Sequence, residues 1–137
     1  SELNEYRQSN DSTIAAWAAK RRTDEDLADL HQCVAEAEAS LNDYERFIEL
    51  DVRFHSLLAR ASANQVAIIV TEVLGNVEKE TLRSKMLTLT PEGRVALGRR
   101  ILDTHSIILE AIRQQDSRAA RSAMQTHTKA AGRDLQL

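Results

Sequence analysis

The stretch Tyr44–Leu58, YERFIELDVRFHSLL, decides how this chain folds. Its apolar residues recur at intervals of three and four, which is typical of one face of an amphipathic helix. Two polar residues interrupt that face, which consists of Tyr44, Phe47, Ile48, Asp51, Phe54, His55 and Leu58. An ionised carboxylate is costly in an apolar interior unless it is paired or binds a metal. Asp51 and His55 are therefore the first candidates for a functional site.

The same periodicity continues towards the N-terminus and predicts two more helices. The first covers about Glu2–Lys20, and its inward residues are expected to be Leu3, Tyr6, Ile14, Trp17 and Ala18. Thr23 and Asp26 resemble a capping box. They open a second helix with the stripe Leu27, Leu30, Val34, Ala37 and Leu41. Asn42 with Glu45 is expected to open the third helix in the same way.

Towards the C-terminus, capping residues mark three further helices. Asn64 precedes a helix whose inward stripe is expected to be Val66, Ile69, Val70, Val73, Leu74 and Val77. Thr90-Pro91 opens a fifth helix and Asp116 a sixth. The pattern leaves open whether Lys85–Gly98 holds a seventh.

Composition supports a single all-α domain over residues 1–137. The chain has 42% hydrophobic residues, four glycines and one proline, which favours helices and allows one core. We expect an antiparallel bundle of about six to seven helices, with consecutive helices as antiparallel neighbours because the connections are short. The sequence opens at Ser1 without a methionine and is helical almost at once, so we expect a missing N-terminal neighbour.

Charge and hydropathy indicate which classes of partner this chain is not expected to bind. The net charge is −3 and the densest basic run is Lys20-Arg21-Arg22, so the chain by itself is not expected to bind DNA. No apolar run approaches a membrane span and the N-terminus lacks the regions of a signal peptide. Cys33, the single cysteine, is expected to be a buried small hydrophobe. We expect a soluble, cytoplasmic protein.

Two further helices repeat the polar interruption seen at Asp51 and His55. His105 lies within the apolar face of the fifth helix, and His127 follows Ala120, Ala123 and Met124 on the sixth. Three neutral nitrogens and one carboxylate oxygen suit Zn, Ni, Mn or Fe better than Ca or Mg, and zinc is our first choice. The alternative is that each residue is a hydrogen-bonded core residue without a metal. His31 has no accompanying carboxylate and is expected at the surface or at the boundary of the core.

Longer motifs around these residues resemble the FCD domain, the C-terminal sensing domain of FadR-type regulators in the GntR family. DVRFHSLLARASAN, residues 51–64, is similar to that domain's D-x-x-F-H…N signature. HSIILEAIRQQDSRAARSAMQTH, residues 105–127, is similar to its histidine-containing ending. RQSND at residues 7–11 and AAWAAKRRT at residues 15–23 resemble its opening segments. Asn10 and Asp11 depart from the family there, since Leu and Glu are usual.

The resemblance implies a fold, a site and a role. The family's metal ligands carry over onto Asp51, His55, His105 and His127, the residues that the apolar faces had isolated. It implies that a small organic acid completes the metal coordination, and that a winged helix-turn-helix domain, absent from this chain, binds DNA. Arg7 lies on the inward line of the first helix. It is interpreted either as a clamp for the effector's carboxylate or as a partner of Asp11 at i+4. A homodimer is expected because operators are commonly two-fold.

Three other functions fit the same residues. A metal-dependent enzyme is the main alternative, but di-iron bundles use E-x-x-H motifs, which are absent here, and we expect no spare carboxylate beside the ligands to act as a base. A structural bundle could hold the four residues in a hydrogen-bonded network without metal. The metal itself could also be the species that is sensed.

Overall fold

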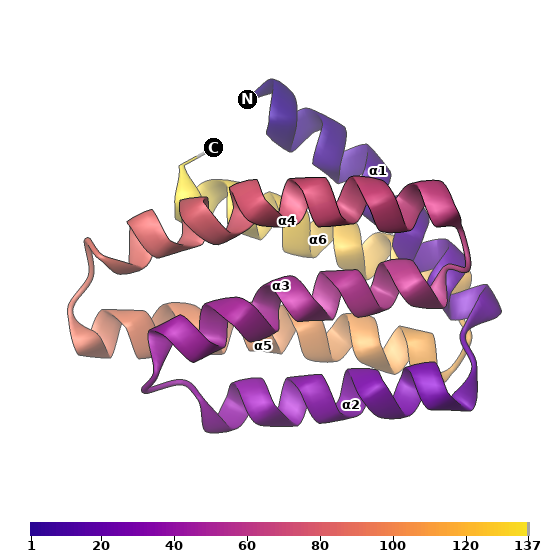
Figure 1. Cartoon of the computed structure of the whole chain (residues 1–137), viewed down its shortest axis with the longest axis horizontal. Coiled ribbons are helices and arrows are strands. Elements are labelled where there is room, and N and C mark those ends of the chain that lie inside the picture. The colour runs from indigo at the N-terminus through magenta and orange to yellow at the C-terminus, as the bar shows by residue number, and fades with distance from the viewer. Residues whose placement is uncertain (137) are drawn as a thin grey trace.

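The computed structural model describes residues 1–136, which form six helices and no strand (Figure 1). The prediction of an all-α fold is confirmed. Lys85–Gly98 contains the end of one helix, a turn and the start of the next rather than a seventh helix. The helices are α1 Glu2–Arg21, α2 Asp24–Ala39, α3 Tyr44–Ala61, α4 Gln65–Met86, α5 Pro91–Arg113 and α6 Ser117–Leu135.

Side-chain caps set where the helices begin. The predicted capping box is present, since Thr23 Oγ1 accepts from the Asp26 amide and the Asp26 carboxylate accepts from the Thr23 amide, both at 3.0 Å. Asn64, Thr90 and Asp116 cap their helices as predicted. The cap of α3 is Asp43 rather than Asn42. The Asp43 amide bonds to the Ser40 carbonyl at 2.9 Å, which leaves Asn42 inside the turn.

The helices form two layers of three. α2, α3 and α4 make one layer, and α1, α6 and α5 make the other (Figure 1). The expectation that all consecutive helices are neighbours is wrong for two pairs, α1 with α2 and α4 with α5. Instead, α1 packs mainly on α6, and α4 packs mainly on α3. The reason is that α3 buries residues around most of its circumference, so it needs α2 and α4 on its two sides and α1 across from it.

α4 faces the core with a different side from the one expected. Val66, Ile69, Val73 and Val77 are 45–68% exposed, while Ala67, Thr71, Gly75, Leu82 and Met86 are buried. Small residues bring α4 close to α3, since a Cβ on Gly75 would lie 3.2 Å from Val52 Cγ1. Small residues at the contact let α4 lie closer to α3 than large side chains would allow.

α1 follows the same principle. It buries Ala15, Ala16, Ala18 and Ala19, and packs mainly on α6. Ile14 and Ala18 are buried as predicted, but Tyr6 is 51% exposed, contrary to the expectation. Tyr6 lies in the N-terminal part of α1, where residues 1–10 are all exposed or half-buried, before the segment of the helix that packs in the core.

Cys33 lies on α2 and is 2% exposed, as expected. Its thiol donates to the Leu50 carbonyl at 3.3 Å, and burial raises its pKa to about 11. His31 on the same helix is exposed, also as expected. Among residues 1–136, no helix has the length and apolar character needed to cross a membrane.

Candidate metal centre

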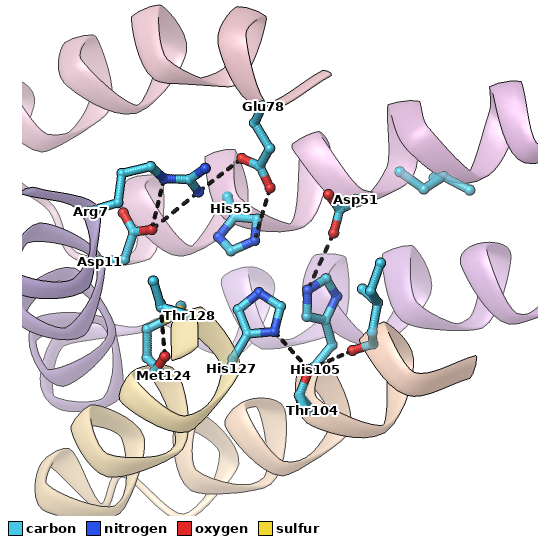
Figure 2. A network of polar contacts seen from close by, with 12 residues as sticks. Arg7, Asp11, Asp51, His55, Glu78, Thr104, His105, Met124, His127 and Thr128 are labelled. Atoms are coloured by element: carbon cyan, nitrogen blue, oxygen red, sulfur yellow. Dashed lines mark hydrogen bonds and ion pairs between the residues drawn. The ribbon is translucent and has the colours of Figure 1, made fainter. Parts of the chain in front are cut away.

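The polar residues that interrupt the apolar faces meet between the two layers. Asp51 and His55 come from α3, His105 from α5 and His127 from α6 (Figure 2). All four are 2–7% exposed. The i, i+4 spacing of Asp51 and His55 places both side chains on the inner face of α3. The structure therefore brings the four predicted ligands into one region.

The three imidazoles form a compact cluster. Ring centroids are 5.4 Å apart for His55–His105 and His55–His127, and 4.7 Å apart for His105–His127. One nitrogen from each ring lies within 4.8 Å of the other two. Nε2 of His55 and of His105 has no hydrogen-bond partner in the described part of the chain. Buried nitrogens are normally satisfied, so two such atoms in one cluster of histidines fit a metal donor set.

The hydrogen bonds of Thr104 define the tautomer of His127. The Thr104 hydroxyl donates its single proton to the Ile101 carbonyl at 2.7 Å, and its oxygen lies 2.7 Å from His127 Nδ1. His127 Nδ1 must then be the donor, which leaves the lone pair on Nε2. A ring nitrogen held in this way from outside is the usual support for a metal-binding histidine.

His105 is held by an aromatic ring. Phe54 stacks on it with centroids 4.1 Å apart and an interplanar angle of 11°. Burial, together with the neighbouring His127 and His55, lowers the pKa of His105 well below its usual value. The pKa of His127 is lowered to about 3, mainly by burial. Both rings are therefore neutral near pH 7, which is the form that binds metals.

A second carboxylate, Glu78 of α4, stands beside Asp51. Burial raises the pKa of Asp51 well above its usual value, and the nearby Glu78 raises it further. Burial also acts to raise the pKa of Glu78, but His55 and Arg7 outweigh it and the pKa is lowered. Asp51 Oδ1 lies 3.4 Å from His105 Nε2, and Glu78 Oε1 lies 3.5 Å from His55 Nε2.

Arg7 of α1 closes the site on one side. Its guanidinium donates to Asp11 from Nε at 3.2 Å and from Nη2 at 3.1 Å, and Nη2 also donates to Glu78 Oε2 at 3.0 Å (Figure 2). Burial acts to lower the pKa of Arg7, but Glu78 and Asp11 outweigh it and raise the pKa. Pairing with Asp11, one of the two interpretations of Arg7, is thus present.

Glu78 is not among the residues that the sequence predicts for the site. The expectation that no spare carboxylate lies beside the ligands is wrong. Glu78 continues the buried line of Thr71, Gly75 and Leu82 on α4, whereas hydrophobic periodicity predicts the row of valines and Ile69 as the inward face. A search for small residues at a spacing of three and four would have placed Glu78 inside.

Two spaces adjoin the site. A cavity of about 40 Å³ is lined by Arg7, Asp51, Glu78 and His127, among others. Beside it, a groove of about 340 Å³ runs between α5 and α6, and both are bordered by Ile101 and His127. The groove has the volume of a small-ligand site, whereas the cavity is close to the size of a single water.

Comparisons with known proteins agree on a family. The sequence model of the FCD domain matches residues 2–130. The galactonate operon transcriptional repressor of Escherichia coli K12 is 29% identical over 135 residues, which is 98% of this chain and 57% of that protein. The transcriptional repressor NanR of Salmonella newport is 30% identical over 125 residues, 85% of this chain and 44% of that protein. The chain thus spans about half the length of these relatives.

Solved structures show the same fold. A Streptococcus agalactiae GntR chain superposes with a TM-score of 0.80 at 28% identity, over 96% of this chain and 57% of that one. E. coli McbR/YncC superposes with a TM-score of 0.85 at 19% identity, over 98% of this chain and 63% of that one.

Proposed function

The chain belongs to the FCD domain family, and on that premise we propose that it is the ligand-sensing domain of a GntR-type transcriptional regulator. In this proposal, Asp51, His55, His105 and His127 hold a divalent transition metal. A small organic acid binds at the metal and changes DNA binding by a separate N-terminal winged helix-turn-helix domain. The relatives support regulation, since they are named as transcriptional repressors.

The donor set supports the metal. Three imidazoles and a carboxylate are typical ligands of zinc, nickel, manganese and iron, and zinc remains our first choice. When bound, such an ion supplies positive charge and open positions for carboxylate oxygens. The residues prepare the site for it, because Thr104 orients His127 and Phe54 fixes the plane of His105.

The groove between α5 and α6 offers room for a ligand beside the metal centre, and His127 lies where it meets the cavity. Arg100 and Arg133 lie on its wall together with Asp103 and Asp134, and Arg100 pairs with Asp134 at 3.5 Å, so the charges of the wall are balanced. Arg7, on the opposite side of the cavity, is proposed as the clamp for the carboxylate of the organic acid. Its guanidinium presents paired donors that match a carboxylate better than a lysine would.

The remaining parts of the proposal concern the whole regulator. A cytoplasmic location, FadR-type architecture and a homodimer follow from the family and from two-fold operators. The regulator is proposed to bind DNA through its other domain, since this chain carries a net charge of −3.

One observation carries the proposal: His55 Nε2 and His105 Nε2 are buried without a hydrogen-bond partner in residues 1–136, and carboxylate oxygens of Glu78 and Asp51 lie 3.5 and 3.4 Å from them. The test is elemental analysis of the purified protein followed by thermal unfolding with and without a chelator. We expect about one metal per chain and a lower melting temperature after chelation. Asp51→Asn should weaken metal binding. Asp103→Asn should not, because Asp103 is an exposed residue on α5.

If the purified protein contains no metal and a chelator does not change its melting temperature, the hydrogen-bonded network without metal is favoured instead. If metal binds and no organic acid binds to the loaded protein, the metal itself is the sensed species.

One observation favours the enzymatic alternative, namely that Glu78 stands beside the ligands as a general base would. Its charge is engaged by Arg7 at 3.0 Å, which lowers its basicity. Turnover of ester or phosphoester substrates by the zinc-loaded protein, lost in Glu78→Gln, would establish that alternative.

A further inference from the structure

Glu78 makes both kinds of contact that the proposed effector would make. Its Oε2 accepts from the Arg7 guanidinium at 3.0 Å, and its Oε1 faces His55 Nε2 at 3.5 Å. Its side chain is 11% exposed, so it lies inside the site rather than at its edge (Figure 2). One carboxylate therefore bridges the clamp and the histidine cluster.

The space around this bridge is small. The cavity at Arg7 and Glu78 has a volume of about 40 Å³, which is close to the ~30 Å³ that one water occupies in the liquid and too small for a whole metabolite. Arg7 already has two carboxylate partners, Asp11 and Glu78. A further carboxylate would add a like charge to Asp11, Asp51 and Glu78 in a poorly solvated site. One of these groups has to leave before Arg7 can bind an effector.

Of the two carboxylates paired with Arg7, only Glu78 joins two helices, so the loss of its bond to Arg7 would change how the helices are connected. Asp11 sits four residues from Arg7 on the same helix, so that pair is local. Glu78 belongs to α4, which packs mainly on α3. Its bond to Arg7 links α4 to α1 across 71 residues of sequence.

We propose that Glu78 is an internal substitute for the effector's carboxylate and that effector binding displaces it from Arg7, which releases α4 from α1. This inference rests on the proposed function. It assigns a competing role to a residue outside the predicted ligand set, and it identifies α4 as the element that transmits binding.

The test uses Co²⁺ as the metal, because its visible absorption reports coordination, and acetate as the simplest carboxylate. Glu78→Gln keeps the size of the side chain and removes its charge. We expect it to bind acetate about tenfold more tightly than the wild type while binding Co²⁺ more weakly. A merely structural role would weaken both. Glu72→Gln is the matched control, because Glu72 lies on the exposed side of α4, and it should change neither.

Equal or weaker acetate binding by folded Glu78→Gln would overturn the inference. If the wild type binds neither Co²⁺ nor acetate, the proposed function fails instead. Hydrogen exchange in the wild-type protein needs no variant: acetate added to the Co²⁺-loaded chain should speed exchange in α4 around Glu78. Unchanged or slower exchange there would also overturn the inference.

Discussion

Replacing His127 with glutamine is expected to remove part of the sensitivity of the chelated protein to acid. Burial holds the pKa of His127 at about 3 in the folded protein, whereas an unfolded histidine titrates near 6.5. Between these values the unfolded chain binds a proton that the folded protein does not. The stability from neutral His127 is thus fully present above about pH 6.5 and is lost as the pH falls towards 3.

The magnitude follows from the difference between the two pKa values. Lowering the pH from about 7.5 to about 5 should cost roughly 2 kcal/mol through His127 alone. This figure depends almost wholly on the unfolded value, because a folded pKa of about 3 leaves the ring neutral at pH 5. Asp51 and His105 also titrate differently in the two states, but their contributions are largely common to wild type and variant.

Urea unfolding followed by circular dichroism, in the presence of a chelator, measures the effect. The loss of unfolding free energy between the two pH values should be about 2 kcal/mol smaller in His127→Gln than in the wild type. His31→Gln is the control, since its side chain is exposed on α2, and it should retain the full loss. An equal loss in His127→Gln and wild type would refute the reasoning, because His127 would then be charged in the folded protein.

Three further changes test other parts of the structure. Thr104→Val removes the acceptor that holds His127 Nδ1–H and should weaken metal binding by about 10–100-fold in a chelator competition, whereas unchanged affinity would show that the tautomer is set elsewhere. Phe54→Ala removes the ring stacked on His105 and should lower the unfolding free energy by about 3–5 kcal/mol in urea; a much smaller loss would mean that the core closes over the gap. Thr23→Ala breaks the capping box of α2 and should cost about 1 kcal/mol in thermal unfolding without altering metal affinity, because α2 contributes no residue to the site.

The helices that carry the site could be predicted because large apolar residues define one face of each. On α3, Phe47, Ile48 and Phe54 indicate which way the interior lies, and Asp51 and His55 share that direction. The same holds for His105 and His127. Convergence of the four residues therefore needed only the helical period and an interior common to all the helices.

The inward face of α4 could not be predicted in this way, because the helix has one face of large apolar residues and another face of small residues. Its valines form the more hydrophobic face, yet the helix packs through Ala67, Thr71 and Gly75, whose small size permits close contact with α3. Hydrophobic periodicity reflects the free energy of moving each side chain out of water, and it takes little account of how closely two helices can pack. Glu78 was missed for this reason, since it lies on the small-residue side.

The order of the helices in space was also beyond the sequence. Short connections limit where the next helix begins but not which layer it joins. The turn at residues 87–90 carries the chain from α4 into the other layer, and α5 then packs on α2 and α6. The choice depends on how much surface α3 has to bury, a property of the assembled core.

The environment of Cys33 makes the protein suitable for site-specific labelling. With a pKa of about 11, roughly one thiol in ten thousand is ionised at pH 7, and the thiolate is the form that reacts with maleimides. Cys33 is also the only cysteine in the chain. A single cysteine introduced at an exposed position would therefore take up a fluorophore or spin label selectively, without replacement of the native residue.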